Sequence, residues 1–270
     1  MDANEIVRQF ERIGARAQVR IFPNASFDRV RLDVLRDDRG EFYDVLTGPR
    51  IDVRVVDARP DMRHLLLMGV PGTSGASRRN GDRFRFLCGH DERHWFVAAV
   101  PGARGVSNVR TAMEALKPEA VLREQERSGV RGRDGVLRRT GAYIRQGEWF
   151  FVPRPELRVD PLMVLRREPI RRGAGKAHWV DEVYRIGGDV VYVNRAHPNG
   201  ITQDEYSELV TRDPDAKRDQ WRVMRRNATA FARGRIRHPD HATITLGFWH
   251  EVFMNTENQA PGMEMVAFLD

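Results

Sequence analysis

Short segments in which apolar and polar residues alternate fill most of the first seventy positions. Alternation with a period of two places successive side chains on opposite faces of a strand, so that one face can turn to a core. Turn-forming residues such as those at 37–40 separate the segments. We therefore predict a sheet built from strands at 18–22, 30–35, 41–46, 51–56 and 63–70.

The same pattern continues along the chain as hairpins, with few helices between them. Hairpins are predicted around turns that contain glycine or proline, at 83–100, 141–153, 179–194 and 234–257. A further stretch, 263–269, is expected as an edge strand. The predicted fold class is therefore α+β, with predominantly antiparallel β-sheet and hairpins and about four to five helices.

Capping residues indicate where helices begin. Asp2 with Glu5 resembles a capping box, and Thr202 with Glu205 forms a clearer one. Another helix is expected after Ser107.

A charged, glycine-containing segment divides the chain near its middle. The stretch 128–140 has almost no residues that suit a core, which makes it a candidate linker. The predicted organisation is a β-rich half, 1–127, and an α+β half, 141–270. The alternative is a single compact domain in which 128–140 is a surface loop, since 270 residues suit either arrangement.

Composition restricts the class of protein. Apolar residues make up 41% of the chain, enough for a packed core, and no apolar run reaches the roughly 18 residues of a membrane span. Cys88 is the single cysteine, so a disulfide within the chain is excluded. The charged stretch 1–14 lacks the apolar segment of a signal peptide. We expect a soluble cytoplasmic protein without a membrane partner.

Positive charge suggests an anionic partner such as DNA or RNA. The formal net charge is +7, and all but three of the 45 basic residues are arginines. The strongest predicted helix, 214–233, has apolar residues at helical spacing and arginines on its other faces, and Gly234 follows it. The alternative is a coding bias toward arginine on a solvated helix face. The candidate nucleic-acid-binding residues, which include two from a glycine-rich loop, are Arg218, Arg222, Arg225, Arg226, Arg233, Arg78 and Arg79.

Three histidines fall in the predicted hairpin at 234–257. His238 and His241 flank a Pro-Asp turn and, together with Asp240, offer ligand types that a divalent metal accepts. Strand alternation places His250 among core side chains, where an imidazole needs a hydrogen bond or a metal. We therefore predict a metal or catalytic site here, with satisfied structural histidines as the alternative.

A second candidate set lies at 88–94. His90 and His94 are candidate metal ligands at the turn of a hairpin. Cys88 next to acids and imidazoles is a candidate nucleophile, with a buried small hydrophobic residue as the alternative.

The run QGEWFF at 146–151, the pair His178-Trp179 and the run GDVVYV at 188–193 resemble the strand layout of papain-like cell-wall hydrolases. The resemblance implies Cys88 as nucleophile and His178 as base, with His197 or Asn194 orienting the base. The resemblance therefore implies a papain-like cysteine hydrolase.

These patterns lead to three hypotheses of different classes. The first is a protein that binds nucleic acid or another polyanion through the arginine-faced helix. The second is a histidine-centred hydrolase, either with or without a divalent metal as its cofactor, acting on a phosphodiester or another anionic substrate. In it, His250 and His178 are candidate catalytic residues. The third, lesser hypothesis is the papain-like cysteine hydrolase.

Overall fold

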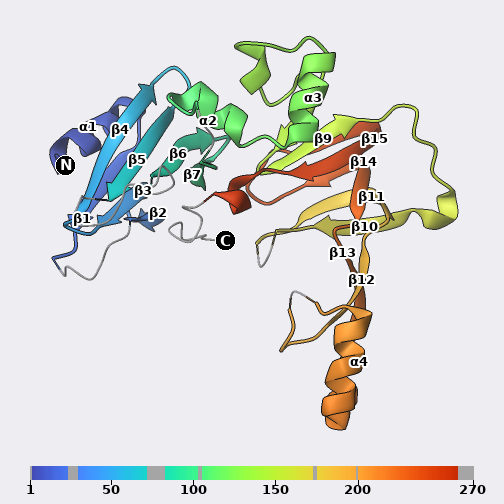
Figure 1. Cartoon of the computed structure of the whole chain (residues 1–270). Coiled ribbons are helices and arrows are strands. Elements are labelled where there is room, and N and C mark those ends of the chain that lie inside the picture. Colours follow the sequence, from blue (N-terminus) through green and yellow to red (C-terminus); the bar gives the residue numbers. More distant parts are fainter. Residues whose placement is uncertain are drawn as a thin grey trace.

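The computed structural model describes residues 2–23, 30–71, 83–102, 105–172, 175–198 and 200–260. These residues form four α-helices and fifteen β-strands, and nearly all strand pairs are antiparallel. The α+β prediction is therefore confirmed. The chain builds two strand-rich units side by side, with an arm that extends away from the second one (Figure 1).

The first unit packs a three-stranded sheet and a four-stranded sheet around one core. The three-stranded sheet has the order β1 (Arg16–Ile21), β3 (Gly40–Thr47), β2 (Val30–Asp37), and β1 lies parallel to β3. The other sheet runs in chain order through β4 (Ile51–Arg59), β5 (His64–Pro71), β6 (Phe84–Asp91) and β7 (His94–Ala99). Helix α1 (Ala3–Arg12) starts at the predicted cap, where the Asp2 carboxylate accepts from the N–H of Asn4 and Glu5, and it contributes Phe10 to the core.

The segment between the units is packed against them. It holds helices α2 (Val109–Ala115) and α3 (Glu119–Arg127) and the 3-10 turn η1 (Asp134–Val136). Lys117 is buried and donates to Gln125 at 2.8 Å and to the Gly135 carbonyl at 2.6 Å. The Tyr143 hydroxyl also donates to the Gly135 carbonyl, at 2.6 Å. The division of the chain at 128–140 stays a prediction.

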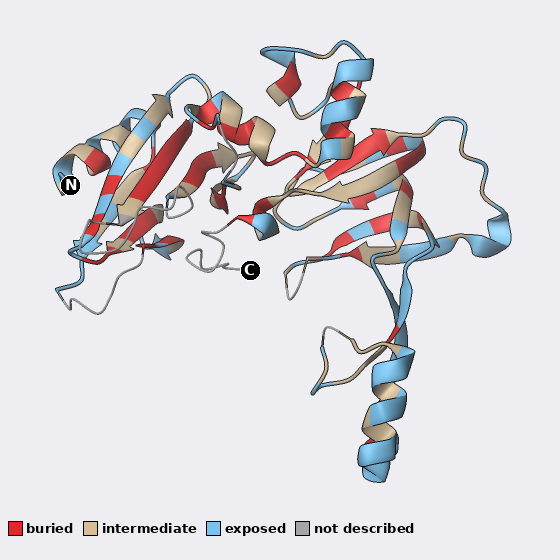
Figure 2. Ribbon diagram, in the orientation of Figure 1, coloured by how far each residue is buried: buried red, intermediate tan, exposed pale blue. Residues whose placement is uncertain are grey.

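The second unit is a six-stranded antiparallel sheet (Figure 1). Its core contains Phe151, Val180, Val183 and Ile236, and Figure 2 shows the buried residues concentrated in the two units. The 3-10 turns η2 (Pro161–Met163) and η4 (Glu257–Gln259) lie outside the sheet. The strand order is β10 (Leu165–Ile170), β11 (His178–Ile186), β14 (Thr229–Arg237), β15 (Ile244–Met254), β9 (Trp149–Pro153), β8 (Ile144–Gln146).

Residues 187–228, between β11 and β14, form the arm. Its strand pairing differs from one sequence prediction. Strand β12 (Asp189–Val193) was expected to fold back onto β11, but it pairs with β13 (Arg222–Arg226), while β11 pairs with β14. The two strand pairs therefore continue outward, and α4 (Gln203–Arg212) lies at the far end (Figure 1). Gly188 permits the close approach, because a Cβ there would lie 2.6 Å from the Arg226 carbonyl oxygen.

The prediction of a helix at 214–233 is wrong. Only the 3-10 turn η3 (Pro214–Arg218) is helical, and the rest of the segment forms β13 and β14. The segment forms strands because β13 pairs along its whole length with β12, and β14 pairs on both sides, with β11 and with β15. Gly234 marks a register shift in β14, where a Cβ would lie 2.8 Å from that of Asp181.

Other sequence predictions hold. Thr202 and Glu205 form the expected capping box of α4, and the hairpin at 234–257 is β14 with β15. None of the helices in the described part of the chain has the length and apolar character of a membrane span. The expected strand at 263–269 lies outside the described residues.

Candidate metal centre

Strand register brings three histidines together at one end of the six-stranded sheet. Trp179 of β11 is paired with Arg237 of β14, so the neighbouring residues His178 and His238 lie next to each other. The turn at 238–243 then carries His241 back toward the same place, before β15 begins. These are the residues of the described chain that group as candidate metal ligands.

The three imidazoles stack on one another. Ring centroids of His178 and His238 are 4.1 Å apart, those of His238 and His241 4.7 Å, and those of His178 and His241 5.6 Å. One ligand nitrogen from each ring can be chosen so that all three lie within 4.8 Å of one another. Nitrogens bound to one tetrahedral zinc ion lie about 3.4 Å apart. An ion lies in the plane of each imidazole that binds it, and these rings are within 28° of parallel, so they must turn as well as approach by about an ångström to bind it.

His178 is nearly completely buried, and neither of its ring nitrogens has a hydrogen-bond partner among the described residues. A buried polar atom without a partner costs about 1–3 kcal/mol. Burial of the His178 ring in the folded chain is therefore unfavourable unless a bound group interacts with one of its nitrogens. This is the observation that most strongly indicates a bound group.

Gly147 leaves space beside the histidines. It connects β8 to β9 with φ +57°, in the left-handed region that favours glycine. A Cβ at this position would lie 2.8 Å from His241 Nε2 and 3.5 Å from His178 Nε2. Both Nε2 atoms thus lie near the same point, which any side chain at position 147 would occupy.

The histidines are held in the neutral form that a metal requires. Burial, with a smaller effect from the neighbouring His238, lowers the pKa of His178 to about 3 and that of His241 to about 4. Burial also lowers the pKa of His238. A neutral imidazole has a free lone pair, so these rings can ligate at neutral pH without first losing a proton.

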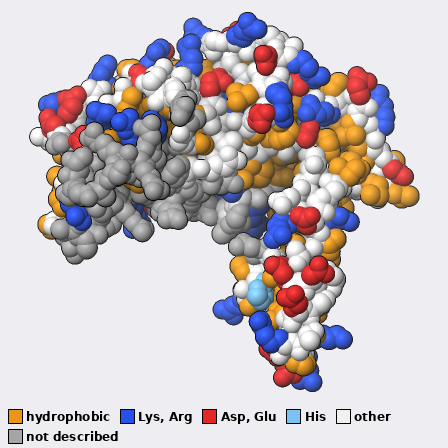
Figure 3. Space-filling model, viewed as in Figure 1, with side chains coloured by type: hydrophobic (Ala, Val, Ile, Leu, Met, Phe, Trp, Pro, Cys, Tyr) orange, Lys and Arg blue, Asp and Glu red, His pale blue; other side chains and the backbone are white. Residues whose placement is uncertain are grey.

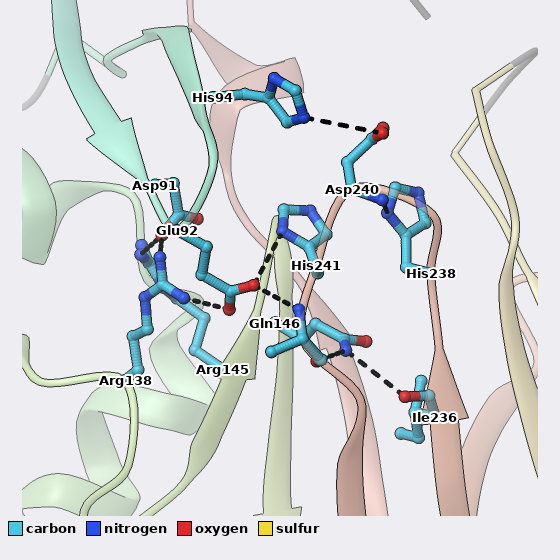
Figure 4. A network of polar contacts seen from close by, with 11 residues as sticks. Asp91, Glu92, His94, Arg138, Arg145, Gln146, Ile236, His238, Asp240 and His241 are labelled. Carbon is cyan, nitrogen blue, oxygen red and sulfur yellow. Dashed lines mark hydrogen bonds and ion pairs between the residues drawn. The ribbon is translucent and has the colours of Figure 1, made fainter.

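Hydrogen bonds from the protein fix the turn that carries two of the ligands. The buried side chain of Gln146 donates to the Ala242 carbonyl at 2.6 Å and to the Ile236 carbonyl at 3.4 Å (Figure 4). His238 Nδ1 accepts from the backbone N–H of Asp240 at 3.2 Å. To ligate through Nδ1, His238 exchanges this hydrogen bond for the ion.

The turn of the β6–β7 hairpin lies beside His241. Glu92 Oε2 is 3.8 Å from His241 Nδ1, and it accepts a hydrogen bond from the backbone N–H of Ala242 (Figure 4). Arg138 donates to the other Glu92 oxygen. A carboxylate from the first unit therefore lies next to a candidate ligand from the second.

A row of charged and titratable groups continues from the turn. Asp240 Oδ2 accepts from Lys176 at 2.9 Å, and Oδ1 lies 3.9 Å from His94 Nε2. On its other side, His94 Nδ1 lies 2.6 Å from Glu41 Oε1. Burial raises the pKa of Asp240, but the hydrogen bond and charge of Lys176, together with the charges of His238 and His94, outweigh burial, so the pKa is lowered.

These groups line a cleft of about 890 Å³ between the two units. The cleft volume lies within the roughly 300–1,000 Å³ typical of small-molecule sites. Its lining is partly apolar, with Trp95, Phe96 and Phe150, and it carries charges of both signs, among them Glu41, Asp240, Arg172 and Lys176.

Other candidate residues from the sequence lie apart from this centre. The His90 ring packs edge-on against Trp95, with centroids 4.9 Å apart. His250 is buried in β15 and donates from Nδ1 to the Phe248 carbonyl at 2.8 Å, which supports the structural alternative for this residue.

The papain-like arrangement finds no support in the positions of its residues. Cys88 is buried in the core of the first unit, and burial raises the pKa of its thiol far above the usual value. A buried neutral thiol is a poor nucleophile. The ring of His197 stacks on Trp221 of the arm, with centroids 5.6 Å apart, while His178 lies in the candidate metal centre, against His238 and His241.

The arginines proposed for polyanion binding do not share one helix face, because that helix does not form. Arg225 and Arg226 donate to the carbonyls of Gly187 and Gly200 in the arm, and Arg218 is paired with Asp215. Arg222 is exposed in β13, whereas Arg233 pairs with Glu182 and lies over Trp249. Arg78 and Arg79 lie outside the described residues.

The arm as a whole is balanced in charge. Residues 187–228 contain seven basic and seven acidic side chains, and Figure 3 shows both kinds interspersed on the arm. Such a surface lacks the positive field by which proteins attract polynucleotides.

Several site residues were not predicted from the sequence, namely Glu92, Gln146, Gly147 and Lys176. A glycine in a hairpin turn and a buried glutamine at the end of a strand have many structural uses, and their contacts with the histidines depend on long-range strand pairing. Comparison of the chain with models of protein families, with curated proteins and with solved structures found no match.

Proposed function

We propose that the protein binds one divalent transition metal at His178, His238 and His241 and uses it to hydrolyse a substrate held in the adjacent cleft. The observation that carries the proposal is the buried His178 ring with both nitrogens unpartnered. A metal ion would satisfy one nitrogen and remove the cost of burying it.

The donor set favours zinc. Neutral imidazoles are ligands that zinc accepts readily, and three of them leave the fourth tetrahedral position open for water. Sites of this kind lower the pKa of the bound water to about 7, which supplies hydroxide at neutral pH. The chain's own residues would accept the proton and bind the substrate.

His94 is the candidate proton acceptor. Its Nδ1 lies 2.6 Å from Glu41 Oε1, so the ring keeps one orientation, with Nε2 3.9 Å from Asp240 Oδ1 in the cleft. A carboxylate that accepts from Nδ1–H leaves Nε2 as the basic nitrogen. Lys176, held next to the centre by Asp240, is the candidate for binding a negative charge of the substrate.

The cleft lining guides the choice of substrate. Because acidic and basic side chains both line it, with aromatic side chains between them, it suits a compact ester or amide better than a polyanion. Polynucleotide binding through the arm arginines stays a prediction that no contact in the described chain favours.

The test uses the purified full chain, stripped with a chelator and reloaded with zinc. We expect hydrolysis of p-nitrophenyl acetate or bis(p-nitrophenyl) phosphate by the zinc-loaded protein, loss of this activity on chelation, and a rate lowered at least a hundredfold in His241→Gln. Zinc-independent hydrolysis, or no hydrolysis of either ester by zinc-loaded protein, counts against the catalytic part of the proposal.

A further inference from the structure

Glu92 has an unusual backbone for its residue type. It lies directly after β6, in the turn to β7, with φ +52°. Residues with a side chain rarely adopt this left-handed region, and the conformation persists only where surrounding contacts hold it. Glycine or asparagine would suit the turn better, so the contacts of the Glu92 side chain must help to hold this backbone.

The contacts of that side chain all point to the second unit or to the segment that leads to it. Glu92 accepts from the backbone N–H of Ala242, the residue that follows the ligand His241, and from Arg138 (Figure 4). The carboxylate is 17% exposed, so solvent screens it only in part. Asp91, its neighbour in the turn, pairs with Arg138 as well.

His241 presents its two nitrogens to different surroundings. Nε2 lies near the point beside Gly147 that a Cβ would occupy, and His178 Nε2 lies near the same point. Nδ1 is buried without a hydrogen-bond partner in the described chain, and the Glu92 carboxylate is the acid group beside it, at 3.8 Å. A small closure of this gap makes an Nδ1–H to carboxylate hydrogen bond.

We propose that Glu92 is the positioning residue of the metal centre: its carboxylate accepts from His241 Nδ1–H and so directs the Nε2 lone pair to the metal. This inference rests on the proposed function. A carboxylate behind a ligating histidine fixes its tautomer and makes it a better donor, and its loss typically lowers metal affinity 10- to 100-fold.

The arrangement makes metal binding depend on both units. The ligands come from the second unit, while the carboxylate that orients one of them comes from a hairpin of the first. Zinc therefore holds the β6–β7 turn against the turn at 238–243, and the cleft keeps its shape through this contact.

The test compares zinc affinities of the full chain by competition with a chromogenic chelator. We expect Glu92→Gln to lower the affinity about 10- to 100-fold, and cobalt-loaded Glu92→Gln to show shifted visible bands, because the donor strength of His241 changes. Glu41→Gln is the matched control: it removes a carboxylate bound to His94, which is not a ligand, and it is expected to leave zinc affinity unchanged.

Two outcomes separate the two proposals. If wild-type protein binds no zinc, the proposed function fails. If wild type binds zinc and Glu92→Gln binds it equally well with the same cobalt spectrum, the metal centre stands and the role of Glu92 is overturned. Should Glu92→Gln fold poorly, Glu92→Gly replaces it, since glycine accepts the left-handed backbone and still removes the carboxylate; the same comparison then decides.

Discussion

The imidazole ring of His178 lies stacked on that of His238, with ring centroids 4.1 Å apart. Sixty residues separate the two in sequence, and the arm occupies most of that interval. The antiparallel pairing of β11 with β14 nevertheless brings them side by side. Two protonated rings at this distance would repel each other, so the stacking adds to burial in favouring neutral imidazoles, the form that binds a metal.

Replacement of His178 by leucine gives opposite results with and without metal. Because both nitrogens of this buried ring lack partners in the described structure, we expect metal-free His178→Leu to be as stable as the wild type or more stable by about 1 kcal/mol. With zinc at a hundred times its dissociation constant, only the wild type gains about 2.7 kcal/mol. Urea unfolding with and without zinc measures this. A large loss of stability in the metal-free variant would instead indicate a structural histidine.

Substitution of Gly147 tests the open point beside the histidines. In Gly147→Ala the new Cβ meets His241 Nε2 at 2.8 Å, so we expect a zinc affinity at least tenfold lower in chelator competition. Gly132→Ala is the control, since Gly132 has φ +60° and nothing within 4 Å of the added Cβ. Both variants share a backbone strain of about 1–2 kcal/mol; equal zinc affinities in the two would contradict the account.

His64, which lies outside the candidate metal centre, makes the folding stability depend on pH. It is buried, donates from Nδ1 to the Met62 carbonyl at 2.6 Å, and has its pKa lowered to about 4 by burial. The unfolded chain binds a proton here near pH 6.5, and the folded chain only near pH 4. Folding stability is therefore complete above pH 6.5 and falls as the pH drops toward 4, by up to about 3 kcal/mol.

The comparison with His64→Gln isolates this contribution. The stability difference between wild type and variant, measured by denaturant unfolding at pH 7, 6, 5 and 4, is expected to shrink steadily as the pH falls. Parallel stability curves over this range would show that His64 does not titrate as described.

The arm is separable from the metal centre. Ile186 at the end of β11 is paired with Thr229 at the start of β14, so an Asn-Gly turn in place of residues 187–228 closes a regular hairpin. We expect this variant to keep the circular dichroism of a sheet protein and to bind zinc with wild-type affinity. If zinc binding is lost with the arm, the centre depends on contacts that the described structure does not contain.

The same variant decides the polynucleotide hypothesis. The balanced charge of the arm predicts weak binding of single-stranded DNA at low salt, with little change when the arm is removed. Tight binding by the wild type that disappears with residues 187–228 would restore the arginines of the arm as a binding surface.

Local sequence patterns predicted two helix starts and the strands of the first unit. The Asp2 and Thr202 caps mark true helix starts, and alternation identifies the strands of the first unit. The segment at 214–233 was misassigned because spacing of apolar residues at three and four positions also arises when two short strands meet at an irregular junction. Asn227, with φ +59°, provides this junction between β13 and β14.

The sequence identified the candidate metal centre only in part, for a similar reason. His238 and His241 were visible because four residues of one turn contain both. His178 was a candidate for different chemistry, since β11 was expected to pair with the strand that follows it. Its true partner lies beyond the arm, and no local pattern reveals a pairing across forty residues.

Zinc stoichiometry tests the central claim most directly. The full chain is stripped with a chelator, dialysed against zinc, and analysed by inductively coupled plasma mass spectrometry, next to the double variant His178→Gln/His241→Gln. The account predicts one tightly bound zinc ion per wild-type chain and none per double-variant chain. Wild-type protein that emerges without zinc, or a double variant that retains it in equal amount, would contradict the account.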